Sequence, residues 1–220
     1  MDRKIVLDWY ENQNHIEEMI HWNKGKLKHW EEEVIQFFPA GASVLDIGCG
    51  LGREAFALYD KGFAVTGIDI SKSILQEVKQ LASINHYNLS FLHYDGKNLP
   101  FSENSFDVAI IWAQTFGLLY GEEYKHQLLL ECKRVLKERG LLSYSGHDYN
   151  FVTKYYKQFM EGRKFYAYAD TDLYWETFTP QELVEPATKA GFDVIECKEG
   201  EIYHPEDGVV LYCVCRKGNE

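Results

Sequence analysis

The sequence lacks an excess of basic residues. Its 23 lysines and arginines stand against 34 aspartates and glutamates, which gives a formal net charge of −11. The one short basic run, Lys24, Lys26 and Lys28, is typical of a solvated helix face. Because an acidic surface repels phosphate backbones, the composition argues against nucleic acid as a substrate or partner.

Other features are missing as well. No apolar run approaches the length of a membrane span, so we expect no membrane association. The eight histidines show no HxxxH or HExxH spacing, and the sequence therefore predicts no metal site. The five cysteines are odd in number, form no CxxC pair and follow no secretory leader. This pattern favours reduced thiols in a cytoplasmic protein.

What the sequence does contain is an alternation of apolar runs and amphipathic segments, and its 220 residues suit one α/β domain. Runs that are apolar throughout are typical of strands buried on both faces of a parallel sheet. The pattern predicts a Rossmann-like α/β fold, with a mostly parallel sheet and helices on both faces. Strands are expected at 43–47, 63–68, 89–94, 106–112, 141–145, 192–197 and 209–215, and helices at 51–61, after Ser71, at 128–136 and at 180–190.

The expected core leaves two other parts of the chain. Residues 1–40 are interpreted as an N-terminal helical cap, in which Leu27, Trp30, Val34 and Phe37 share one face. The core itself covers 41–147 and 179–220. Residues 148–178 form an insertion that is unusually rich in aromatic side chains.

The strongest motif is the glycine-rich segment VLDIGCGLG at residues 44–52, where a buried strand turns into a helix. Glycines at such a turn let the backbone approach a ligand closely, and the start of the helix presents free N–H groups. The carboxylate of Asp46, just before the loop, suits a ligand with an ammonium group and would repel a pyrophosphate. A tight turn with no ligand is the alternative interpretation.

Two further acids follow the next two expected strands. Asp69 can accept hydrogen bonds from the ribose hydroxyls of a nucleoside lying across the sheet edge, or it can help to cap the following helix. Asp95 can accept from an exocyclic adenine amine. Because parallel strands end at the same edge, all three acids are expected to converge there.

These motifs resemble those of the class I S-adenosylmethionine-dependent methyltransferases, in particular the small-molecule branch related to the ubiquinone-biosynthesis enzymes. The resemblance extends over 40–146 and more loosely over 178–215. It rests on residues 44–52, 67–70, 95–101, 105–112, 134–140 and 191–192 in this order and at these spacings.

The resemblance implies a seven-stranded sheet with an antiparallel last strand, and S-adenosylmethionine as the cofactor across the ends of the first strands. Asp46, Gly48 and Gly50 would line the methionine part, with Cys49 and Gly52 in the same loop. Asp69 and Ile70 would hold the ribose and adenine, Asp95 and Gly96 the adenine, and Trp112 and Gln114 would lie near the sulfonium.

The sequence predicts the acceptor side less sharply. The cofactor's methyl group is already activated, so the protein must chiefly align a nucleophile and exclude water. His147, beyond the fifth strand, is the candidate general base, with a polar loop residue as the alternative. The insertion is expected to be a lid over a small apolar or aromatic acceptor, or over an amine held by cation–π contact. The residues expected in this lid are Tyr149, Tyr166, Tyr168 and Trp175, with a satellite core as the alternative.

Two other functions remain open at this point. An NAD(P)-dependent oxidoreductase would share the sheet and Asp69, but the GxGxG spacing and Asp46 argue against it. A non-catalytic cofactor-binding protein of the same fold is the other alternative.

Overall fold

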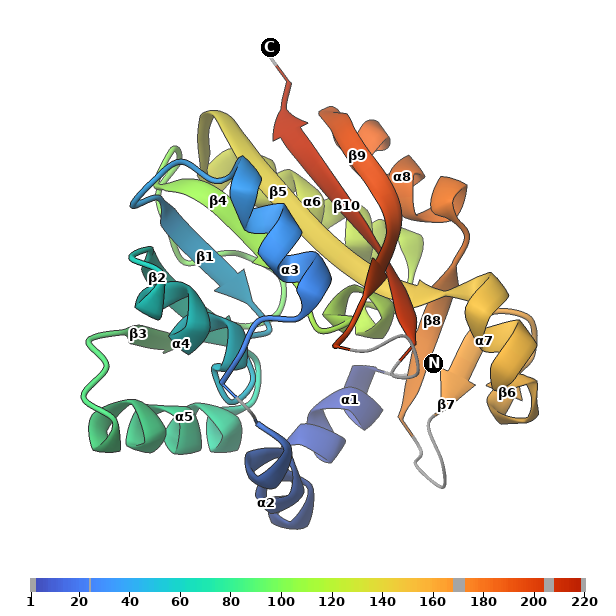
Figure 1. Cartoon of the computed structure of the whole chain (residues 1–220), viewed down its shortest axis with the longest axis horizontal. Helices are drawn as coiled ribbons and strands as arrows, with labels where there is room; N and C mark the ends of the chain where they lie inside the picture. The colour runs from blue at the N-terminus through green and yellow to red at the C-terminus, as the bar shows by residue number, and fades with distance from the viewer. Residues whose placement is uncertain (1–2, 24, 168–172, 204–207, 219–220) are drawn as a thin grey trace.

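The computed structural model describes residues 3–23, 25–167, 173–203 and 208–218 (Figure 1). Its main sheet has the order β3-β2-β1-β4-β5-β10-β9, in which β10 is antiparallel to both of its neighbours and the strands from β3 to β5 are parallel. The predicted fold class, with its seven strands and antiparallel last strand, is confirmed. The strands are β1 (Ser43–Ile47), β2 (Ala64–Asp69), β3 (Ser90–His93), β4 (Phe106–Ile111), β5 (Leu136–Asp148), β9 (Phe192–Glu201) and β10 (Val209–Lys217).

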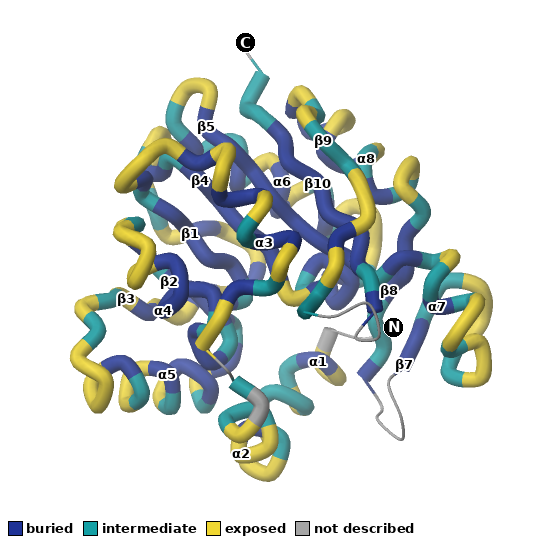
Figure 2. The backbone as a smooth tube through the Cα atoms, in the orientation of Figure 1, coloured by how far each residue is buried: buried dark blue, intermediate teal, exposed yellow. Residues whose placement is uncertain are grey.

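Helices cover both faces of this sheet (Figures 1 and 2). Alternate residues of β1 point to opposite faces, so Leu45 joins a core with one set of helices and Val44 a core with the other. On the first face lie α6 (Glu122–Val135) and α8 (Pro180–Lys189), and on the second α3 (His29–Val34), α4 (Arg53–Asp60) and α5 (Lys72–Ile84). Ser71 caps α5, because its hydroxyl accepts from the Ile74 amide at 3.1 Å.

Several predicted boundaries were wrong. Helix α6 begins at Glu122, because its first turn follows a glycine and carries two acids suited to a helix N-terminus. Strand β5 begins at Leu136, since the polar segment that precedes the apolar run still pairs with β4 across a bulge. Phe37, expected on the buried face of the N-terminal segment, is exposed, whereas Phe38 is buried. The chain there tightens into the 3₁₀ turn η1 (Ile35–Phe37), which changes the angular spacing of the side chains.

The N-terminal segment begins with two helices, α1 (Arg3–Tyr10) and α2 (Gln13–Trp22), placed beside the carboxyl ends of the first strands (Figure 1). The carboxylate of Glu11 accepts the Lys72 amide at 2.8 Å, and the Tyr10 carbonyl accepts the Ser71 hydroxyl at 3.1 Å. These bonds fasten the junction of α1 and α2 to the start of α5.

The aromatic-rich residues after β5 form a small layer of their own. Strand β8 is parallel to the end of β5, where His147 is opposite Thr177, and β7 and β6 continue the layer as antiparallel strands. The elements here are α7 (Tyr149–Tyr155), η3 (Lys157–Phe159), β6 (Met160–Glu161), β7 (Phe165–Ala167) and β8 (Tyr174–Phe178).

Candidate functional site

A cavity of about 500 Å³ lies at the carboxyl edge of the parallel strands. One wall comes from the glycine loop and the end of β2, and the opposite wall comes from α1, α2, β8, α6 and the turn η2 (Thr115–Leu118) after β4. This is the edge at which open α/β sheets bind ligands. The residues that line the sheet side include Gly48, Cys49, Gly50, Leu51, Asp69 and Ile70, and those opposite include Val6, Trp9, Tyr10, His15, Met19, Leu118, Tyr124 and Trp175.

The glycine loop needs its glycines for two different reasons. Gly48 has a φ of +75°, and a Cβ there would lie 2.6 Å from the Thr115 side chain, so only glycine lets η2 pack on the loop. Gly50 has a φ of +50°, and a Cβ there would meet only the methyl group of Met19, at 3.9 Å. Since Gly50 lines the cavity, a side chain at this position would occupy space that a ligand can use.

Asp69 joins the glycine loop to the start of α5. Its carboxylate accepts the amide of Gly50 at 3.0 Å and the amide of Ser71 at 2.9 Å, and it lines the cavity. It does not cap α5, because the Ser71 hydroxyl does so. Burial is the largest influence on this carboxyl and raises its pKa above the ordinary value.

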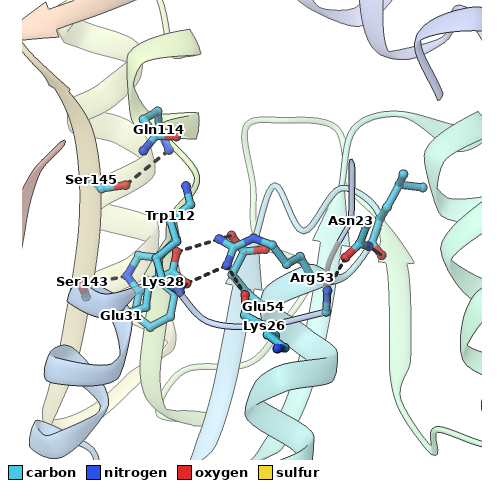
Figure 3. A network of polar contacts seen from close by, with 12 residues as sticks. Asn23, Lys26, Lys28, Glu31, Arg53, Glu54, Trp112, Gln114, Ser143 and Ser145 are labelled. Atoms are coloured by element: carbon cyan, nitrogen blue, oxygen red, sulfur yellow. Dashed lines mark hydrogen bonds and ion pairs between the residues drawn. The ribbon is translucent and has the colours of Figure 1, made fainter. Parts of the chain in front are cut away.

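A buried charge cluster lies beside the loop (Figure 3). The guanidinium of Arg53 donates to both oxygens of Glu31, at 2.7 and 2.6 Å, and also to Glu54 and to the Lys26 carbonyl. Burial alone would lower the pKa of Arg53, but Glu54 and Glu31 hold it above its usual value. Arg53 and Glu54 line the cavity, so the cluster reaches the ligand space.

Within the described residues, three buried polar atoms near this edge have no hydrogen-bond partner: Oδ2 of Asp46, Nε2 of Gln114 and, at the end of β5, Oδ2 of Asp148. Gln114 and its neighbour Ala113 both have left-handed backbones, with φ of +61° and +50°. Unpaired buried polar groups and strained non-glycine residues are uncommon and gather at functional sites. Asp46 and Gln114 do not line the cavity themselves, but Gly48 and Gly50, which follow Asp46 in the loop, do. The unpaired carboxylate oxygen of Asp46 therefore lies next to the open space at Gly50, which suits a ligand that carries an ammonium group.

The other predicted cofactor residues lie close to this edge without lining the cavity. Asp95 is exposed, and its carboxylate accepts the amides of Lys97 and Asn98, which lowers its pKa. Gly96 and Gly52 belong to neighbouring turns. The indole of Trp112 donates to the Ser143 hydroxyl at 2.9 Å and packs against Trp30, on the side of the sheet that α3 covers. The roles assigned to these residues stay predictions.

His147, the candidate base, is at the end of β5 and does not line the cavity. Its ring lies edge-on to Tyr166 and Trp175, with ring centroids 5.2 and 5.9 Å away. Burial and then the charge of Lys28 lower its pKa to about 3, so the imidazole is neutral at neutral pH. Trp175, one of the two rings that contact the imidazole, does line the cavity.

The remaining lid residues are distributed differently. Tyr166 is buried against His147, and Tyr149 is half-buried at the start of α7. Tyr168 lies outside the described residues. The sequence analysis missed most of the opposite wall, which α1 and α2 supply through Trp9, His15 and Met19. The signal that could have revealed this wall is the apolar face of each of these two short helices, which is larger than expected for a helix that is exposed to solvent on all sides.

The described residues contain no group of three or more His, Cys, Asp or Glu side chains that could hold a metal ion. Within the same ranges, no helix combines the length and the apolar character that crossing a membrane demands.

Comparisons with known proteins agree with this geometry. Residues 44–140 match a family model described as a methyltransferase domain. A ubiquinone biosynthesis O-methyltransferase of Coxiella burnetii is 26% identical over 204 residues, which is 91% of this chain and 83% of that protein. A putative methyltransferase of Bacillus subtilis is 29% identical over 119 residues, 54% of this chain and 48% of that one, so the chain spans about half the length of this relative.

Among solved structures, an S-adenosylmethionine-dependent methyltransferase of Methanosarcina mazei has a TM-score of 0.75 at 22% identity, covering 86% of this chain and 98% of that chain. That similarity shows the fold. Together the comparisons confirm the resemblance predicted from the sequence, and none favours the oxidoreductase alternative.

Proposed function

We propose that this chain methylates a small molecule, with S-adenosylmethionine as the methyl donor, because residues 44–140 match a methyltransferase-domain model and the fold is that of a solved S-adenosylmethionine-dependent methyltransferase. The observation that carries the proposal is the cavity of about 500 Å³, in which the glycine loop and Asp69 face a wall of aromatic and aliphatic side chains. A concave cavity of this volume suits a small molecule, and the net charge of −11 opposes nucleic acid.

The residues present divide the work of holding the cofactor. Asp46 and the loop around Gly48 and Gly50 would hold its methionine part, and Asp69 and Ile70 its ribose and adenine. When bound, the cofactor supplies a methyl group already activated on a sulfonium. The chain then has to orient the acceptor and exclude water, and α1 contributes the cavity residues Trp9 and Tyr10 to the wall opposite the glycine loop.

The acceptor would be an apolar or aromatic small molecule, or an amine held against aromatic rings. This proposal is supported by Trp9, Tyr10, Tyr124 and Trp175, whose rings line the cavity and suit stacking and cation–π contacts. The name of the Coxiella relative, an O-methyltransferase, makes hydroxyl-bearing acceptors the first to try. Of the residues expected in the lid, this proposal uses only Trp175, on β8. The five unpaired cysteines support a cytoplasmic setting.

A direct role of His147 as the base is not supported by a contact with the cavity. We propose instead that its neutral ring, packed edge-on, helps to hold Trp175 in the cavity wall. An acceptor with an ionised oxygen or sulfur would need no base from the protein.

The test is to incubate the purified protein with S-adenosylmethionine and pools of small acceptors, phenols and amines in separate pools, and to measure the release of S-adenosylhomocysteine. We expect release above the background without acceptor in at least one pool. Binding of S-adenosylhomocysteine without release in any pool would favour a non-catalytic binding protein instead.

The acceptor wall is tested by Trp175→Ala once a pool is active. We expect a lower kcat/KM for the acceptor and an unchanged affinity for S-adenosylhomocysteine, because the substitution removes only the wall opposite the loop. The matched control is Phe37→Ala, which removes an exposed ring remote from the cavity. Equal loss of acceptor turnover and cofactor affinity in Trp175→Ala would contradict this division of the cavity.

A further inference from the structure

The charge cluster beside the glycine loop contains more negative than positive charge. One guanidinium, Arg53, is shared between the carboxylates of Glu31 and Glu54, both of which are buried. Asp46, on β1, adds a third buried carboxyl and has no cation of its own. Charges buried in protein must be paired or neutralised, because their removal from water costs far more than a single hydrogen bond returns.

Asp46 differs from the other acids of this edge in its partners. Glu31 and Glu54 receive N–H groups from Arg53, and Asp69 receives two backbone amides. Asp46 is only 1% exposed, and its Oδ2 has no hydrogen-bond partner among the residues that the structure describes. Burial, and next the negative charge of Glu54, raise the pKa of Asp46 well above its usual range.

We propose that Asp46 is protonated in the cofactor-free protein and that the ammonium group of the bound cofactor displaces this proton into solvent. The inference rests on the proposed function and adds to it a coupling between cofactor binding and pH. The O–H bond of the carboxyl group breaks, its proton passes to the buffer, and the carboxylate that remains is the counter-charge of the ligand's cation. A carboxylate left unpaired in the free protein is the unfavourable state that protonation avoids.

The neighbours of Asp46 do not provide the missing positive charge. Arg53 lowers the pKa of Asp46, but it is already engaged by the carboxylates of Glu31 and Glu54, and burial outweighs its effect. The thiol of Cys49 is kept neutral, because burial and the adjacent acids raise its pKa. The charged groups that act on Asp46 are Glu54, Arg53, Asp69 and Glu31, and the Cys49 thiol of the loop is beside them. Lys28 and Tyr203 lie one step further away, next to Arg53, Glu31 and Glu54.

The experiment is a calorimetric titration of the protein with S-adenosylhomocysteine, which carries the ammonium group but no sulfonium, in buffers of different ionisation enthalpy at one pH. The dependence of the binding enthalpy on the buffer counts the protons exchanged. We expect net release of up to one proton per ligand, and an affinity that rises with pH, by at most about tenfold per pH unit, above the range in which exposed carboxylates titrate.

Asp46→Asn keeps the shape of the protonated carboxyl and cannot lose a proton, so its titration should lack this release. Asp60→Asn is the matched control, since Asp60 is exposed at the end of α4 and should leave the release intact. Infrared spectroscopy adds a readout that does not require the variant to bind the ligand. The carbonyl stretch of a protonated carboxyl should be present in the free wild-type protein, absent from Asp46→Asn, and lost from the wild type when the ligand binds.

The outcomes separate this inference from the proposed function. Binding without proton release in the wild type, or an equal release in Asp46→Asn, overturns the role given to Asp46 and leaves the cofactor site in place. No binding of S-adenosylhomocysteine to the wild type overturns the proposed function and this inference together.

Discussion

Replacement of Asp69 by alanine should damage both the fold and the cofactor site, because one carboxylate serves both. In the free protein it accepts the amides of Gly50 and Ser71, at 3.0 and 2.9 Å, and so ties the glycine loop to the N-terminus of α5. It also faces the cavity, where it would accept from the hydroxyls of a ribose.

The size of each effect follows from these contacts. A hydrogen bond to a charged group contributes about 1.5 to 3 kcal/mol, and two bonds that share one carboxylate are not additive, so the loss of both should lower the free energy of unfolding by about 3 kcal/mol. For a chain of this length, that corresponds to a fall in Tm of roughly 6 to 12 °C. The lost ribose contact should weaken binding of S-adenosylhomocysteine by roughly 10- to 100-fold.

Thermal unfolding and calorimetric titration of Asp69→Ala measure the two effects separately. Asp95→Ala is a matched control for stability, because Asp95 also accepts two backbone amides, those of Lys97 and Asn98, but from an exposed position where water can replace it. Its Tm should fall by less. If Asp69→Ala unfolded at the wild-type temperature and bound the ligand as tightly, the carboxylate would have neither role.

Other substitutions test separate parts of the account. Gly50→Val should abolish binding of S-adenosylhomocysteine by filling the cavity, whereas Gly62→Val, which meets the same backbone strain at a φ of +89° on a remote turn, should lower Tm and leave affinity intact; equal affinities would misplace the site. Lys125→Met should destabilise the fold by about 3 to 5 kcal/mol in chemical denaturation, because it removes the buried cation that pairs with Glu176 and lies over two aromatic rings. A loss of less than about 1 kcal/mol would show that this ion pair is unimportant for stability. Burial alone would raise the pKa of Asp107, but bonds from a serine and from a lysine ammonium lower it to about 2, below its value in the unfolded chain, so its contribution to stability is present above about pH 4 and is lost as the pH falls towards about 2. Asp107→Asn should therefore be less stable than the wild type at neutral pH, and denaturant titrations should show that this difference in stability shrinks over the acid range. A difference that stays constant with pH would refute this role of Asp107.

The sheet and one wall of the cavity could be predicted because their signals are local. The strand over 43–47 is an unbroken apolar run, and the glycine loop follows it directly, so the place of Asp46 and Gly50 at the sheet edge follows from the chain itself. Asp69 was found in the same way, as the residue that ends the second strand. What the sequence did not indicate was its bond to the Gly50 amide, which joins residues 19 positions apart.

The opposite wall could not be predicted, because it is assembled by tertiary packing. Trp9 and Met19 are on short amphipathic helices whose pattern shows that they bury one face but not against which element. For Trp112, the sequence indicated the position along the chain but not the face of the sheet on which the ring lies. Its position after β4 suggested a place near the sulfonium, yet its ring turns to the α3 side, where Ser143 and Trp30 receive it. The alternation of side chains along a strand decides between these faces, and one residue of register reverses it.

The measurement that tests the central claim most directly is a parallel calorimetric titration of the purified protein with S-adenosylhomocysteine and with NADH. The glycine loop, the unpaired carboxylate oxygen of Asp46 and the cavity beside them predict stoichiometric binding of S-adenosylhomocysteine and no binding of NADH. Binding of NADH with no heat from S-adenosylhomocysteine would contradict the account, because the same sheet edge would then hold a pyrophosphate beside Asp46.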